Sequence, residues 1–202
     1  NTISCQRKSE IHMKWHEANQ HIRTALPQIR PMLDYLGPIE LPQPSLVSIP
    51  EAVVKIVIGQ MLSNSAARAI YSRVSKATES AGTIGSWLLQ DDVLLSCGLS
   101  KRKVRTIREF SEAYNGNAAM IEVWPSLEYE ELVEEVSRFW GLSIWTADML
   151  AIFHFGHGDV FPASDGSIKR AMEQAGITFG IDENDWRIGS LSPHRTYFSL
   201  CL

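Results

Sequence analysis

Cysteine is scarce in this chain of 202 residues, and its three copies (Cys5, Cys97 and Cys201) lie far apart. So few cysteines cannot form the disulfide framework of a small secreted protein, and their scarcity indicates a reducing compartment. They also cannot supply the four thiolates of a structural zinc site or of an iron–sulfur cluster.

Long apolar runs are lacking as well. No segment reaches the roughly 18 consecutive apolar residues that a membrane-spanning helix needs. The first fifteen residues, NTISCQRKSEIHMKW, contain no apolar core of a secretory signal, so we expect neither a membrane anchor nor secretion. Runs that alternate apolar and polar residues are nearly absent, and neither repeats nor low-complexity segments occur, which argues against a β-sheet or repeat architecture.

An excess of positive charge is missing too. The chain has 19 Lys and Arg against 23 Asp and Glu, a formal net charge of −4. Nucleic-acid-binding proteins usually carry a basic surface, so this balance argues against such a partner. Any binding of phosphates must therefore depend on a local patch and on the N-terminal ends of helices.

What the chain does contain is a series of segments with helical periodicity, separated by Gly and Pro. The spacing of apolar residues predicts helices over 51–77, 101–115, 126–138, 144–156 and 166–175, and a last helix that begins at Pro193. For the helix over 51–77, a kink near Ser63-Asn64 is the alternative to a straight helix. The predicted fold class is all-α, with two helical lobes around a cleft in a single unit of residues 1–202. We place one lobe at 50–155, with a hairpin at 132–156, and the other at 1–49 plus 156–202.

Two segments place a glycine turn directly before a helix. In FWGLSIWTADM (139–149), Gly141 can adopt the left-handed backbone of an abrupt turn, and the next helix then offers unpaired N–H groups to an anion. In CGLSKRKVRTIREF (97–110), Lys and Arg gather where the helix dipole disfavours them, as a phosphate ligand would explain. The alternatives are a hairpin that only packs two helices and a solvated helical face.

An acidic residue follows the Gly- and Pro-rich loop GHGDVFPASDG (156–166). Asp165 either caps the next helix or presents a carboxylate to a positively charged transition state at a cleft wall. Asp159 lies in a turn, where Asp commonly hydrogen-bonds the backbone.

Five segments in this order resemble the helix-hairpin-helix DNA glycosylases, and within them the AlkA-type alkylpurine (3-methyladenine) glycosylases and their compact yeast relatives. VVKIVIGQMLSNSAARAI (53–70) resembles the helix with the Gly-Gln-x-Leu-Ser pattern, and GLSKRKVRTI (98–107) resembles the Gly-Leu-Ser-x-x-Lys segment. FWGLSIWTADM is similar to the hairpin Leu-Pro-Gly-Ile-Gly-x-Trp-Thr-Ala, and DVFPASD (159–165) to the loop Asp-Val-Phe-Pro-x-x-Asp. SPHRTYFSLCL (192–202) is similar to the Pro-x-Arg-Ser-Tyr-Ala helix.

The resemblance implies base excision repair of alkylated purines in duplex DNA, with Asp165 as the catalytic residue. Relatives that also cut the strand carry a Lys where this chain has Trp145, so the resemblance implies a monofunctional enzyme that uses water. Trp145 and Met149 would line the base pocket. A residue of the GQMLSN segment would enter the minor groove as a wedge. The candidates are Met61, Asn64 and Gln60, of which Met61 and Asn64 are expected on one helical face, with a core position as the alternative for Met61.

Phosphate binding in the family involves the hairpin, and often a monovalent cation held by turn carbonyls. By position, the phosphate-binding residues would be Gly141, Ser143, Trp145, Thr146, Lys101 and Lys103. The carbonyls of Ser137, Phe139 and Leu142 would hold Na⁺ or K⁺, and we expect no other cofactor. The implied partner is double-stranded DNA with a lesion or an abasic site, bound by a monomer in the nucleus, or in the cytoplasm of a bacterium.

Some positions depart from the family pattern. Ser143 replaces the second Gly of the hairpin, Met149 stands where the bacterial pattern has a Tyr of the base pocket, and Leu202 ends the chain short of a pocket Trp. Fewer aromatic faces would hold a cationic purine less well. The alternative function is therefore a homologue that binds and bends damaged or abasic DNA with little or no excision. A metal site on His12 and His16, and a helical module unrelated to DNA, are weaker alternatives.

Overall fold

The computed structural model describes residues 2–202, with side chains from residue 13 onward, so the side chains of Cys5 and His12 lie outside the described part. The chain divides into two compact units. We call Pro44–Phe155 the central unit, and Asn1–Gln43 together with Gly156–Leu202 the terminal unit. All regular structure in the described residues is helical, which confirms the all-α class. Among the helices so described, none combines the length and the apolar character needed to cross a bilayer.

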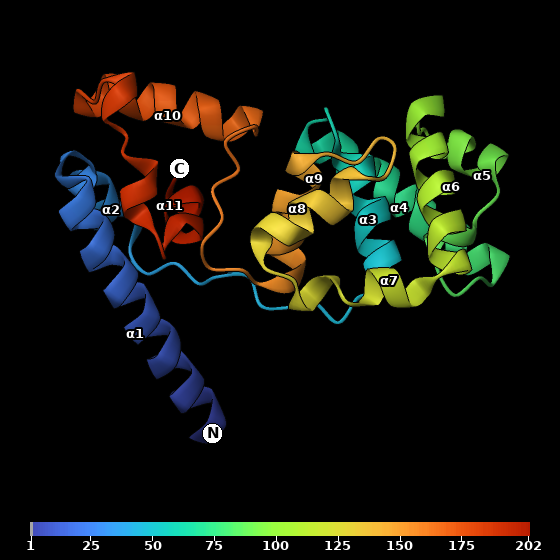
Figure 1. Cartoon of the computed structure of the whole chain (residues 1–202), viewed down its shortest axis with the longest axis horizontal. Helices are drawn as coiled ribbons and strands as arrows, with labels where there is room; N and C mark the ends of the chain where they lie inside the picture. Colours follow the sequence, from blue (N-terminus) through green and yellow to red (C-terminus); the bar gives the residue numbers. More distant parts are fainter. Residues whose placement is uncertain (1) are drawn as a thin grey trace. The chain divides into compact units, whose positions relative to one another are not determined.

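The central unit is built around the helix Ile49–Gly59, which lies in the middle of this unit (Figure 1). Its helices are α3 (Ile49–Gly59), α4 (Asn64–Ala81), α5 (Asp91–Ser96), α6 (Lys101–Gly116), α7 (Ala118–Glu122), α8 (Tyr129–Ser137) and α9 (Ile144–Leu150), with short 3-10 segments at Ser86–Leu88 and Trp124–Ser126. A π-helical turn, Ala151–Phe155, continues α9. Val53, Val54 and Val57 of α3 are fully buried, and α3 packs against α4, α6 and α9. This packing brings the end of α3 close to the start of α6 and to the α8–α9 hairpin.

The predicted helix over 51–77 is divided into α3 and α4, and the turn between them lies directly before the kink predicted near Ser63-Asn64. Ser63 caps α4, and its hydroxyl accepts from the N–H of Ala66 at 3.3 Å. Met61 turns the backbone with a φ of +56°, in the left-handed region that residues other than Gly seldom adopt. The break in the helix therefore comes from a Ser cap and a strained Met.

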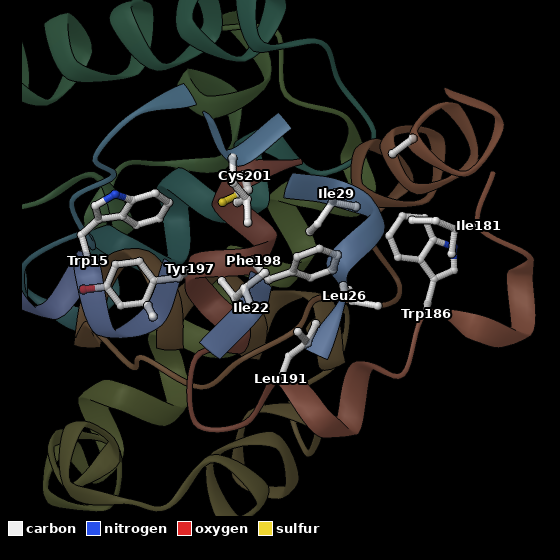
Figure 2. Packing of buried hydrophobic residues seen from close by; sticks show 13 residues of the cluster. Trp15, Ile22, Leu26, Ile29, Ile181, Trp186, Leu191, Tyr197, Phe198 and Cys201 are labelled. Carbon is white, nitrogen blue, oxygen red and sulfur yellow. The ribbon is translucent and has the colours of Figure 1, made fainter. Parts of the chain in front are cut away.

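The terminal unit joins the two ends of the described chain through a shared apolar core. Its helices are α1 (Thr2–Ala25), α2 (Arg30–Leu36), α10 (Gly166–Phe179) and α11 (Arg195–Cys201), with 3-10 segments at Pro27–Ile29, Glu183–Asp185 and Ile188–Leu191. Figure 2 shows Phe198 of α11 beside Ile22, Leu26 and Ile29. Burial also raises the pKa of the Cys201 thiol to about 12, so this cysteine remains protonated and serves the core. The last helix begins at Arg195, two residues later than predicted.

Candidate functional site

The turn between α8 and α9 needs a glycine for two separate reasons. Gly141 has a φ of +79°, which strains any residue with a side chain. A Cβ atom at this position would also lie 2.0 Å from the Oγ1 of Thr106 on α6. The turn is therefore packed directly against the basic helix α6.

Ser143 and Thr146 form a reciprocal cap at the start of α9. The Ser143 hydroxyl accepts from the N–H of Thr146, and the Ser143 N–H donates to the Thr146 hydroxyl at 3.2 Å. Ser143, the departure from the second Gly of the family pattern, thus gains a defined role as a helix cap. Thr146 is fully buried, so the prediction that it binds phosphate is wrong: its N–H and hydroxyl both serve the cap. The N–H of Ile144 remains without an intrahelical acceptor, since it lies in the first helical turn.

Gln60 holds the hairpin turn from the end of α3. Its side-chain amide donates to the carbonyl of Gly141 at 3.1 Å and lies 3.4 Å from the hydroxyl of Thr146. Gln60 thus connects α3 to the hairpin turn, and its role as a wedge stays a prediction.

Met61 projects from the α3–α4 turn into solvent, with a relative exposure of 101%. The alternative in which Met61 belongs to the core is therefore wrong. Asn64 is also exposed, as the first residue of α4. The two do not share a helical face as predicted, since Met61 lies in the turn. An apolar side chain held outward by a strained backbone is typical of a functional position.

The two predicted phosphate-binding lysines differ in their surroundings. Lys103 is half-buried, and its ammonium donates to the carbonyl of Ile58 at 2.7 Å. Burial lowers the pKa of Lys103. This lysine satisfies the C-terminal end of α3, which favours a structural role, and the predicted contact of Lys103 with a phosphate stays a prediction. Lys101 is exposed in the first turn of α6, and its role stays a prediction.

A cation–π contact between α6 and the hairpin was missed by the sequence reasoning. The guanidinium carbon of Arg105 lies 4.0 Å from the ring centroid of Trp140, and that of Arg102 lies 5.7 Å away. Trp140 precedes Gly141 and is 37% exposed. No local sequence signal links Trp140 to Arg105, because the pair forms only when α6 and the turn pack together. The contact braces the turn from its exposed side.

The remaining hairpin predictions concern the base pocket and the cation. Trp145 and Met149 are both half-buried on α9 and stay predictions. Of the three carbonyls predicted to hold Na⁺ or K⁺ (Ser137, Phe139 and Leu142), that of Phe139 also accepts from the N–H of Leu142 at 3.1 Å. The described side chains contain no group of three His, Cys, Asp or Glu residues that would hold a metal ion.

Asp165 caps α10. Its Oδ1 atom accepts from the N–H groups of Ser167 and Ile168 at 2.7 and 3.1 Å, and the residue is half-buried. The cap fixes the orientation of the carboxylate, so capping and catalysis do not exclude each other. Asp159 accepts from the backbone N–H of Arg195 at 3.1 Å, and it also forms an ion pair with that arginine, which the sequence did not reveal.

Comparisons with known proteins show what the whole chain is similar to. No family model matches the chain. The chain is 31% identical over 123 residues to DNA-3-methyladenine glycosylase 1 of Schizosaccharomyces pombe, covering 59% of this chain and 54% of the relative. It is 25% identical over 166 residues to the alkylbase DNA glycosidase-like protein mag2 of the same yeast, covering 79% and 78%. The structure of the S. pombe 3-methyladenine DNA glycosylase in complex with abasic DNA superposes with a TM-score of 0.75 at 22% identity, over 92% of this chain and 94% of that one.

The chain is therefore similar in sequence to a DNA-3-methyladenine glycosylase and to an alkylbase DNA glycosidase-like protein, and it shares the fold of the helix-hairpin-helix DNA glycosylases. The resemblance inferred from five sequence segments is thereby confirmed. The match to the first of these relatives spans only about half of its length, 54%. Three residues that the sequence did not reveal as part of the site, Thr106, Trp140 and Arg195, each lie against a residue that is distant in the sequence.

Proposed function

We propose that this glycosylase homologue is a monofunctional DNA N-glycosylase of base excision repair. It hydrolyses the N-glycosidic bond of alkylated purines, of the 3-methyladenine and 7-methylguanine type, in duplex DNA. The observation that carries the proposal is the carboxylate of Asp165, fixed at the start of α10 by two backbone N–H groups at 2.7 and 3.1 Å. The relationship to a DNA-3-methyladenine glycosylase supports the choice of substrate.

The chemistry follows from the charge that develops on the sugar. Departure of the base gives the deoxyribose oxocarbenium character, and the Asp165 carboxylate stabilises that charge. An alkylated purine already carries positive charge, so it leaves with little acid assistance. Water then attacks C1′, because Trp145 supplies no amine for a Schiff base. The target nucleotide must first leave the base stack, since its glycosidic bond is inaccessible within the duplex.

The hairpin and the α3–α4 turn would bind the DNA. Backbone N–H groups around Gly141 and Ser143 at the start of α9 would bind a phosphate, and Lys101 on α6 would add a positive charge. We also place Na⁺ or K⁺ at the turn carbonyls. Met61 would fill the gap that the extruded nucleotide leaves in the minor groove, since it is apolar and fully exposed. We propose the nucleus as the location, because the compact relatives are yeast proteins.

The test compares the protein with its Asp165→Asn variant. Asn also caps helices, so the variant keeps the start of α10 while it loses the negative charge. We expect release of 3-methyladenine from methylated duplex DNA to fall by about 10²- to 10³-fold or more in a single-turnover assay. Binding to an abasic duplex in a gel shift should be unchanged. Equal release by both proteins would refute the role of Asp165. Tight abasic binding without release by the unmodified protein would favour the alternative, a DNA-binding homologue without excision.

A further inference from the structure

The loop that leads to Asp165 is fastened to α11 by one carboxylate. Asp159 forms a two-atom ion pair with Arg195, with Nε to Oδ1 at 2.8 Å and Nη2 to Oδ2 at 2.9 Å. The backbone N–H of Arg195 also donates to Oδ1 at 3.1 Å, and the Ser192 hydroxyl donates to Oδ2 at 2.7 Å. Bidentate, charge-assisted bonds of this kind constrain geometry more than a single contact does.

The charged state of Asp159 is maintained by these donors. Burial alone would raise the pKa of this carboxyl group, but the hydrogen bonds from Arg195 and Ser192 outweigh it, and the pKa lies below its usual value. The ion pair therefore persists throughout the neutral pH range. Both side chains are still 29% exposed, and pairs as exposed as this one contribute little to global stability. Stability alone does not account for four donors that converge on one carboxylate.

A second set of contacts joins the residues around Asp159 to α11. The Thr196 hydroxyl donates to the carbonyl of His157 at 2.9 Å and accepts from the N–H of Val160 at 2.9 Å. The ring of Phe161 then stacks on Phe198, with centroids 5.9 Å apart. The first half of the loop thus follows the first turns of α11.

The second half of the loop is held by hydrogen bonds within its own backbone. The N–H of Ala163 donates to the carbonyl of Phe161 at 2.8 Å, and the N–H of Asp165 donates to that of Pro162 at 2.9 Å. The Asp165 carboxylate then caps α10. A displacement at Asp159 therefore reaches Asp165 through a short path that is hydrogen-bonded along its length.

We propose that Asp159 and Arg195 are positioning residues, which set the place of the Asp165 carboxylate by clamping the loop between them to α11. The catalytic consequence rests on the proposed function of Asp165. A misplacement of about 1 Å at a reacting group lowers a rate by about 10²-fold. The hairpin belongs to the other unit, so we expect the affinity for DNA to be independent of this clamp.

The first readout is catalytic. We expect Arg195→Ala to lower the single-turnover rate of 3-methyladenine release by about 10²-fold, with unchanged affinity for an abasic duplex. Arg195→Lys keeps the charge but loses the two-atom geometry, so we expect an intermediate loss of about tenfold. Arg23→Ala is the matched control, because it removes the ion pair with Asp34 in the same unit, away from the loop. The control should leave the rate unchanged.

The second readout follows the position of the carboxylate directly. Hydrogen exchange at the amides of Ser167 and Ile168 reports the cap made by Asp165. We expect these amides to exchange about tenfold faster or more in Arg195→Ala, while the core amides of α1 keep their protection. If the Asp159–Arg195 pair stabilises only α11, the exchange rates of the Ser167 and Ile168 amides will be the same in Arg195→Ala as in the unmodified protein.

The outcomes separate this proposal from the proposed function. If the unmodified protein excises the base while Arg195→Ala retains its rate and its protected cap, the positioning role is refuted and the glycosylase function stands. If the unmodified protein excises nothing, the glycosylase function fails, and the exchange at Ser167 and Ile168 still decides whether the clamp positions Asp165.

Discussion

Replacement of Gly141 by Ala tests whether the hairpin turn is fixed by its contact with α6. A Cβ atom at residue 141 would lie 2.0 Å from the Oγ1 and 3.0 Å from the Cβ of Thr106. The backbone at Gly141 also has a φ of +79°. Gly141→Ala therefore adds backbone strain and a steric clash, and the two effects are separable because only the clash depends on Thr106.

The expected loss of stability is the sum of these two terms. A left-handed conformation costs a residue with a side chain roughly 1–2 kcal/mol. Overpacking of a tight contact costs about 1–3 kcal/mol. Gly141→Ala should thus lower the free energy of unfolding by about 2–5 kcal/mol. Thr106→Ala alone should lower it by about 1 kcal/mol, because the hydroxyl of Thr106 donates to the carbonyl of Arg102 at 3.1 Å.

Urea unfolding of the two single variants and the double variant measures the clash as a coupling energy. In Gly141→Ala/Thr106→Ala, we expect recovery of about 1–3 kcal/mol relative to the sum of the single losses. The affinity for an abasic duplex, measured by gel shift, should rank the variants in the same order as their stability, since the displaced turn presents the N–H groups of α9 differently. A coupling energy near zero, or a loss below about 0.5 kcal/mol in Gly141→Ala, would contradict the close approach.

Three further predictions concern single side chains. Lys101→Met should reduce the slope of log DNA affinity against log salt concentration by about one. Lys103→Met should leave this slope unchanged and lower the free energy of unfolding instead, because the ammonium of Lys103 donates to the carbonyl of Ile58. Equal slopes in the two variants would contradict this difference between the lysines. Met61→Ala should lower the preference for abasic over intact duplex by about tenfold with unchanged stability, and a larger effect from Asn64→Ala would transfer the wedge role to Asn64. Burial and the nearby Lys55 lower the pKa of His154 in the folded protein. The stability that this residue contributes is therefore present above the ordinary histidine pKa of about 6.5, and it is lost as the pH falls through the folded pKa. Denaturant unfolding at about pH 7.5 and about pH 5 should show a smaller acid loss in His154→Gln, and equal losses would exclude this role.

The local signals of the sequence were sufficient for the fold class, the hairpin and the capped acid. Gly141 marks the turn because a left-handed backbone favours glycine at that place. Asp165 stands where a capping side chain is expected, before a helix. Both features depend on residues close in sequence, so they can be predicted without the rest of the chain.

The contacts that the sequence did not reveal join residues that are distant in the chain. Lys103 resembles a phosphate ligand in sequence, but it caps the end of α3 through Ile58. Gln60 resembles a wedge, but it binds the carbonyl of Gly141, 81 residues away. The kink predicted near Ser63-Asn64 lies beside the actual break, but the left-handed backbone of Met61 has no local sequence signal. Such roles are set by packing, which a single sequence does not specify.

The most direct test of the proposed function is an analysis of the products formed from methylated duplex DNA. We expect the protein to release free 3-methyladenine and to leave an abasic strand that is intact until it is cleaved by alkali. No trapped protein–DNA adduct should form with borohydride, because Trp145 cannot form a Schiff base. A methylated duplex that remains unchanged, although the protein binds abasic DNA, would contradict the account, and so would a strand that is cut without alkali.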